Sequence, residues 1–153
     1  MANIALLAAV PEEHLVSGLE ILSKEEKVAF GSSAWEVFRQ LEDSTVGAEV
    51  DVFIYPSGSA KQGQPKVRWR AKYLRTIDSI NGAHPVGMRF RPTSTEKYAT
   101  DNQGHWAVFW EVTELTELAK EDALKMSIFV IASSGKPLFS SYIPRGPILV
   151  HAP

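Results

Sequence analysis

The stretch KVAFGSSAWEVFRQLEDSTVGAEVDVFIYP, Lys27 to Pro56, decides the predicted fold because it indicates a strand, a short helix and a second strand in succession. The apolar run Val28 to Phe30 predicts the first strand. Small polar residues follow it, and Ser33 precedes Glu36 by three positions, which is the spacing of a capping box at a helix start. We therefore expect a tight turn at Gly31 to Ser33 that leads directly into a helix.

Apolar residues continue this pattern after the turn. Trp35, Phe38 and Leu41 recur on one face of the predicted helix, and Gly47 opens a strand that extends to Tyr55. No catalytic motif occurs in this stretch, so it predicts an architecture and a way of binding more than a reaction.

The composition is that of a single domain. The chain has 153 residues, of which 44% are hydrophobic and 22% charged, so residues 1–153 can form one core without disulfides. No apolar run approaches the ~20 residues of a membrane-spanning helix, so we expect no membrane partner. Cysteine is absent, which agrees with a cytoplasmic protein. The oligomeric state stays open.

Positive charge is concentrated in the middle of the chain. The net charge is only −2, yet Gly58 to Tyr98 contain nine lysines and arginines against two acidic residues. Such an asymmetry favours an anionic partner, either a nucleic acid or an acidic protein. Solvated outer faces of strands are the alternative explanation.

The clearest strand pattern runs from Val67 to Ile77. Trp69 and Ala71 belong to its apolar and aromatic face, and the alternating positions form a row of bases on the other face. Such a row is typical of phosphate contacts. Together with two more bases in the irregular segment 79–95, the residues that we assign to phosphate contacts are Arg68, Arg70, Lys72, Arg89 and Arg91.

Further apolar runs predict the remaining elements. We expect strands at 4–10, 106–115, 128–132 and 148–150, a helix with Leu15, Leu19 and Leu22 on one face, and a second short helix at 116–125. His14 has no partner at ligand spacing, so we expect a surface or capping residue. Because strands and helices do not alternate regularly, we predict a mainly β, α+β fold: a small curled or closed β-barrel of about six strands with two or three short peripheral helices.

The order of these elements resembles that of the PUA-like superfamily, and within it the EVE and ASCH branches. The segment 28–33 and the strand 46–55 are similar to the family's pocket turn and to its G-D-x-V-x-x-Y strand, with Ala48 where the family usually has an acid. Ala71 stands where the family places a small residue in the following strand. Arg91-Pro92 and the segments 106–115 and 145–150 are similar to its later strands.

This resemblance implies a pocket at the mouth of the barrel that holds a flipped, single or modified nucleobase beside a basic surface. The pocket turn is then Phe30, Gly31, Ser32 and Ser33 with Trp35 just beyond it, and the candidates for a stacking wall are Tyr55, Trp69 and Trp106. A place in the core is the alternative for each aromatic residue. Aromatic faces supply stacking surface for a nucleobase, and nearby lysines and arginines supply affinity for phosphate. The expected partner is therefore a nucleic acid or a nucleotide-like ligand.

Other functions stay open. The protein is alternatively a regulatory module whose basic row meets an acidic protein, or a module that binds a small non-nucleic ligand. Some ASCH proteins are amidohydrolases with a lysine, a threonine and a glutamate in the pocket; this chain has Lys27 and Glu111 but only serines in the turn. We assign no catalytic residue, metal or cofactor, because the histidines lack ligand spacing and no Gly-x-Ser-x-Gly motif occurs.

Overall fold

The computed structural model describes residues 3–58 and 64–153. Its strands are β1 (Ile4–Pro11), β2 (Val28–Ser32), β3 (Asp51–Ser57), β4 (Lys66–Val67), β5 (Trp69–Asp78), β6 (Val108–Glu117), β7 (Leu124–Lys125), β8 (Val130–Ile131) and β9 (Ile148–His151). Its helices are α1 (Glu12–Glu25) and α2 (Trp35–Ser44), with short 3₁₀ helices at Thr93–Lys97, Ala99–Asp101, Lys120–Asp122 and Met126–Ile128.

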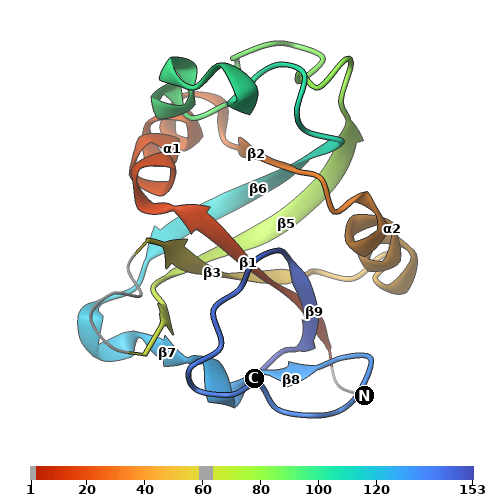
Figure 1. Ribbon diagram of the computed structural model, residues 1–153, viewed down its shortest axis with the longest axis vertical. Coiled ribbons are helices and arrows are strands. Elements are labelled where there is room, and N and C mark those ends of the chain that lie inside the picture. The colour runs from red at the N-terminus through yellow and green to blue at the C-terminus, as the bar shows by residue number, and fades with distance from the viewer. Residues whose placement is uncertain (1–2, 59–63) are drawn as a thin grey trace.

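The main sheet has seven strands in the order β2-β6-β5-β3-β1-β9-β8, and β4 and β7 form a separate pair (Figure 1). β1 and β3 are parallel, and the other paired strands are antiparallel. The predicted α+β class is therefore confirmed. None of the helices within the described residues is long and apolar enough to cross a membrane.

The predicted barrel is not observed. Within residues 3–58 and 64–153, the sheet ends at β2 on one side and at β8 on the other, and these two strands do not pair. The physical reason lies in β1, whose outer edge pairs with β9 from Ile4 to Leu7. A closed barrel would need β2 to pair with that same edge of β1. β9 leaves this edge uncovered only at the last residues of β1.

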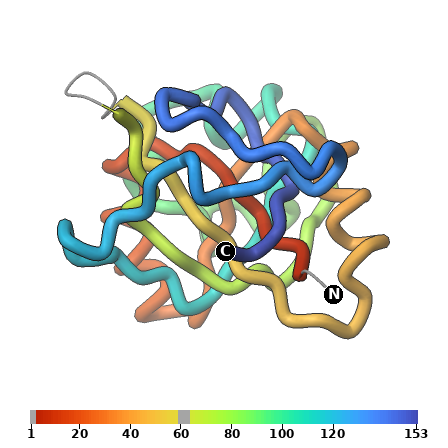
Figure 2. Tube along the Cα trace, turned by 90° about the horizontal axis from the view of Figure 1, so that it is seen from below, coloured from red at the N-terminus to blue at the C-terminus, as the bar shows by residue number. Residues whose placement is uncertain are grey.

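Two hydrophobic cores lie on opposite faces of β1 and β3. Leu6 and Ala8 belong to the core that α1 and α2 cover, whereas Leu7 belongs to a second core with Met126 and Phe129. Seen from below in Figure 2, the C-terminal part of the chain, drawn in blue, crosses this end of the molecule and supplies that second cover. Because β1 is buried on both faces, it has a continuous apolar sequence.

Two aromatic residues of the predicted stacking wall are core residues instead. Trp69 is 0% exposed in the core beneath the helices, and Tyr55 is 1% exposed in the second core. Both strands that carry them lie inside the sheet with packing over these positions, so neither ring can meet a ligand. This corrects the sequence-based assignment of Tyr55 and Trp69.

The segment 28–57 folds as predicted into β2, α2 and β3, but the capping box does not form. α2 begins at Trp35 without a side-chain cap, and Ser32 Oγ accepts a hydrogen bond from Ala34 N at 3.0 Å in the turn before it. Phe38 is buried as predicted. Trp35, one turn earlier, is 44% exposed and lies over the guanidinium of Arg39.

Two helical predictions need correction. In α1 the buried residues include His14, Leu15 and Ile21, whereas Leu19 is exposed, so the apolar face is rotated from the predicted one. The predicted helix 116–125 is wrong: β6 continues to Glu117 in register with β5, and a 3₁₀ turn and β7 follow. Strand pairing along β5 outweighs the local helix propensity of this segment.

Candidate functional site: a cavity between two strand edges

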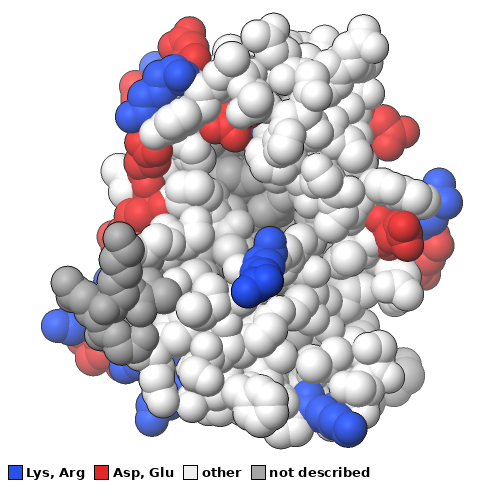
Figure 3. All heavy atoms as spheres, in the orientation of Figure 1, with Lys and Arg blue, Asp and Glu red and all other residues white. Residues whose placement is uncertain are grey.

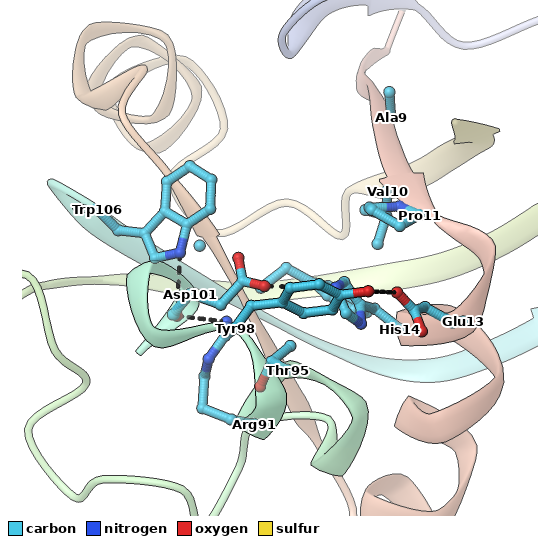
Figure 4. A pocket seen from close by; sticks show the side chains of 12 residues that line it. Ala9, Val10, Pro11, Glu13, His14, Arg91, Thr95, Tyr98, Asp101 and Trp106 are labelled. Atoms are coloured by element: carbon cyan, nitrogen blue, oxygen red, sulfur yellow. Dashed lines mark hydrogen bonds and ion pairs between the residues drawn. The ribbon is translucent and has the colours of Figure 1, made fainter. Parts of the chain in front are cut away.

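A cavity of about 370 Å³ opens where the end of β1, the start of α1, β2 and the segment 91–106 meet. Its lining residues are Ala9, Val10, Pro11, Glu13, His14, Phe30, Gly31, Arg91, Thr95, Tyr98, Asp101 and Trp106. Figure 4 shows Trp106 and Asp101 on one side and Val10 and Pro11 on the other. In the space-filling view, the same face is hollowed near its centre (Figure 3).

The β1 wall of this cavity carries an unpaired peptide edge. Asn3, the residue before β1, accepts a hydrogen bond at its carbonyl from Ala152 N. Peptide groups of alternate residues point the same way, so the odd-numbered residues of β1 also direct theirs toward β9. β9 pairs no further than Leu7, so the peptide groups of Ala9 point past its end. No hydrogen bond to these groups on this side is found within the described parts of the chain.

The β2 wall is a second unpaired edge. Ala29 donates its N–H to Phe90 O at 2.7 Å and accepts at its carbonyl from Arg91, so its peptide groups point away from β6. Gly31 lies two residues further and has the same orientation. Among residues 3–58 and 64–153 nothing bonds to its outward N–H and C=O. Ala9 and Gly31 thus present one donor and one acceptor each to the same cavity.

Trp106 packs on the face of β2 at Gly31. A Cβ atom at Gly31 would come within 2.4 Å of the indole, so the ring rests against the bare backbone of β2. The indole N–H donates to Asp101 O at 3.0 Å, which fixes the ring in its plane. Phe30 and Tyr98 add further aromatic surface to the cavity.

Arg91 anchors the segment that carries these aromatic residues. Its guanidinium is 2% exposed and donates to Ala29 O at 2.7 Å, Asp101 O at 2.8 Å and Asn102 Oδ1 at 3.0 Å. Burial lowers the pKa of Arg91 to about 10, so the group remains a cation at neutral pH. The phosphate role predicted for Arg91 does not fit this position, because the protein's own oxygens hold its donors.

Acidic groups line the α1 side. Glu13 accepts hydrogen bonds from Tyr98 at 2.8 Å and lies 3.0 Å from Lys97, and these bonds lower the pKa of Glu13. His14 Nε2 lies 3.5 Å from the Asp101 carboxylate. Burial lowers the pKa of His14 despite that carboxylate, so its imidazole is neutral at pH 7. The surface or capping role expected for His14 is therefore wrong, since it is buried in a cavity wall.

The predicted pocket residues separate into three groups. Phe30, Gly31 and Trp106 line this cavity. Ser32 and Ser33 line a neighbouring cavity of about 260 Å³ that shares Ala9, Gly31 and Trp106 with the first. Trp35, Tyr55 and Trp69 line neither. Trp35 instead lies outside, at a shallow hollow formed by α2 and the end of β5.

The predicted basic row is not a free basic surface. Arg68 lies 3.7 Å from Glu117, Arg70 lies 4.0 Å from Asp51, and Lys72 pairs with both Glu49 and Asp51. Arg89, in the irregular segment, lies 3.1 Å from Glu25. Neighbouring carboxylates therefore compensate these charges.

The predicted hydrolase pair forms an ion cluster outside the cavity. Glu111 is fully buried, and its carboxylate lies 3.0 Å from Lys27, 2.8 Å from Arg75 and 3.4 Å from His84. Burial alone raises the pKa of Glu111, but the close approach of His84 and the hydrogen bonds from Arg75 and Lys27 outweigh it and lower the pKa to about 2. Neither Lys27 nor Glu111 lines either cavity beside Trp106.

No group of three or more histidine, aspartate or glutamate side chains in residues 3–58 and 64–153 is arranged to hold a metal ion. The cavity offers aromatic surface, the carboxylates of Glu13 and Asp101, and two pairs of backbone donors and acceptors. In comparisons with known proteins, no family model and no curated protein matches the sequence.

Proposed function

We propose that the protein is a binding module that holds a nucleobase, or a ring of nucleobase-like chemistry, in the cavity between β1 and β2. The observation that carries this proposal is the pair of unpaired peptide edges at Ala9 and Gly31, which face one cavity beside the indole of Trp106. A planar heterocycle has donors and acceptors along its edge and π surface on its faces, and both features find partners here.

The size and the lining of the cavity support this ligand class. Small-molecule sites typically measure ~300–1,000 Å³ and combine mostly apolar walls with a few oriented polar groups. The cavity of about 370 Å³ has Phe30, Tyr98 and Trp106 as its aromatic part. Asp101 adds an acceptor for an amino group of the ring, since its carboxylate has one long contact, to His14. Stacking on aromatic side chains contributes ~1–3 kcal/mol per base.

The resemblance to the PUA-like superfamily supports the same proposal. Its EVE and ASCH branches imply a base-holding pocket at the turn that contains Gly31, and that turn borders the cavity. We keep the relationship to the PUA-like superfamily as part of the proposal, although the sheet of this chain is open between β1 and β2. A cytoplasmic location belongs to the proposal as well, on the lack of cysteine in the sequence.

The alternatives have less support. A regulatory module that meets an acidic protein needs a free basic surface, and the carboxylates beside Arg68, Arg70 and Lys72 compensate their charges. An amidohydrolase needs an available lysine, whereas the Lys27 ammonium is bound to Glu111 at 3.0 Å. The Ala9 and Gly31 edges favour a ligand with in-plane donors and acceptors over other small molecules.

Titration of the ¹⁵N-labelled protein with the common nucleosides, followed by amide spectra, tests the proposal. Saturable shifts at the Ala9 and Gly31 amides and at the Trp106 indole N–H are expected for at least one nucleoside. Ribose alone is the matched control, because it lacks the ring, and it should cause no shifts there. If all nucleosides leave these three signals in place at millimolar concentration, the proposed function is wrong.

A further inference from the structure

The second cavity differs in charge from the first, although Trp106 borders both. Its volume is about 260 Å³, and its lining residues are Ala8, Ala9, Gly31, Ser32, Ser33, Ala34, Trp106, Trp110, Arg145, Gly146 and Pro147. No aspartate or glutamate lines it, whereas Glu13 and Asp101 line the first cavity. The first cavity also has the cation Arg91 in its lining, but the donors of Arg91 are held by the protein's own oxygens. The second cavity, which no carboxylate lines, is therefore the better environment for an anionic group of a ligand.

Arg145 is the cation of this second cavity. It is exposed, and no ion pair or hydrogen bond of its side chain is found in the part of the chain that the structure describes. This distinguishes it from Arg91, whose donors are held by buried carbonyls, and from Arg70, which lies near Asp51. In Figure 3 basic atoms stand beside the hollow, and acidic atoms lie on the opposite rim of the hollow.

Two serines line the same cavity as Arg145. Ser32 is 7% exposed, and its Oγ accepts a hydrogen bond from Ala34 N at 3.0 Å, which leaves its O–H free to donate. Ser33 is exposed beside it and adds a second hydroxyl donor. A guanidinium with neutral O–H donors and no carboxylate is a suitable environment for a phosphate group.

We propose that the second cavity binds the phosphate group attached to the ring that the first cavity holds, with Arg145 as its charged contact and Ser32 and Ser33 as hydroxyl donors. This inference rests on the proposed function, and it names the ligand as a nucleotide unit instead of a free base. The two cavities share Ala9, Gly31 and Trp106 in their linings. One ligand can therefore place its ring in the first cavity and its phosphate in the second.

Calorimetric titration of the whole chain with a nucleoside, its 5′-monophosphate and its 3′-monophosphate at low salt tests the proposal. For one of the two monophosphates we expect affinity at least about tenfold above that of the nucleoside, as for a charge-assisted contact. Arg145→Gln should remove this gain and leave nucleoside affinity unchanged, and Arg145→Lys should retain part of it. Arg70→Gln is the matched control and should leave the gain intact.

The outcomes separate this proposal from the proposed function. Nucleoside binding without any gain from phosphate, or a gain that survives Arg145→Gln, overturns the phosphate site alone. Failure of the wild-type protein to bind any of the three ligands overturns the proposed function. A single-stranded trinucleotide distinguishes the source of the phosphate: affinity above that of the mononucleotide, lost in Arg145→Gln, indicates a nucleic acid chain, and equal affinity indicates a free nucleotide.

Discussion

The indole of Trp106 packs against Gly31 so closely that a Cβ atom on Gly31 would lie 2.4 Å from Trp106 Cδ1. Real Cβ atoms do not approach ring atoms to this distance, so the position requires glycine for space. The same contact places the aromatic ring beside the outward N–H and C=O of β2. The aromatic surface of the cavity and the exposed backbone groups of β2 therefore both depend on the contact between Trp106 and Gly31.

We expect Gly31→Ala to displace Trp106 and to weaken ligand binding. The added methyl meets ring atoms near the root of the indole, and overpacking of this kind costs about 1–3 kcal/mol of the free energy of unfolding. The displaced indole N–H should lose its bond to Asp101 O, which its proton signal reports. Gly18→Ala in α1 is the control, because its nearest contact would be 3.4 Å. Unchanged nucleoside affinity in Gly31→Ala would contradict the prediction.

Trp106 and Trp35 should differ in their effect on binding. Trp106 lines both cavities, whereas Trp35 lies outside them with 44% of its surface exposed. We expect Trp106→Ala to lower nucleoside affinity by about 5- to 150-fold, since the loss of a stacked base costs about 1–3 kcal/mol. Trp35→Ala should leave affinity within twofold. Calorimetry on the two variants checks this, and equal losses would show that the aromatic wall of the cavity is not the binding surface.

The strands of the central sheet could be predicted from sequence because their burial leaves a direct pattern. β1 is covered on both faces and has a continuous apolar run, and β6 likewise alternates between two buried sides. The number and closure of strands could not be predicted. Whether β9 or β2 pairs with the outer edge of β1 depends on contacts between distant segments, and no local pattern encodes that choice.

The residues of the cavity could be predicted from sequence only where they lie on or next to predicted strands. Gly31 and Trp106 were identified, but Tyr98 and Asp101 come from an irregular segment that Arg91 fixes through a bond to Ala29 O across the fold. The basic row on β5 was misjudged for a related reason.

Whether a lysine or arginine on a strand is paired with a carboxylate depends on the residue opposite it on the neighbouring strand. Asp51 stands directly opposite Lys72 in the β3–β5 pair. That register is set by tertiary structure, so the charge of the row could not be judged from β5 alone.

Glu111 should make the protein sensitive to acid. Its pKa in the folded state is about 2, below the ordinary value of 4.5, so the unfolded chain binds the proton first. The stability that the ionised carboxylate contributes is therefore present above about pH 5 and is lost as the pH falls toward 2.

We expect Glu111→Gln to be less stable than wild type at pH 7 by about 3 kcal/mol, because the buried amide cannot form the ion pairs that the carboxylate makes with Lys27 and Arg75. Its free energy of unfolding should also vary less between pH 5 and 2. Urea denaturation across this range measures both effects. Glu36→Gln, in the exposed first turn of α2, is the control and should follow the wild-type profile. A wild-type acid dependence in Glu111→Gln would refute the assignment.

Two neighbouring arginines should contribute very differently to stability. Arg91 is buried and donates to Ala29 O and Asp101 O at 2.7 and 2.8 Å, whereas Arg89 is exposed beside Glu25. A lysine ammonium cannot reproduce the planar fork of the guanidinium, so Arg91→Lys should lose about 2–4 kcal/mol by leaving buried carbonyls unpaired. Arg89→Lys should change stability by less than about 0.5 kcal/mol, as for an exposed ion pair.

Because Arg91 positions the segment of Tyr98 and Trp106, hydrogen exchange at the Asn102 amide should accelerate in Arg91→Lys alone. Equal exchange in both variants would contradict the anchoring role of Arg91.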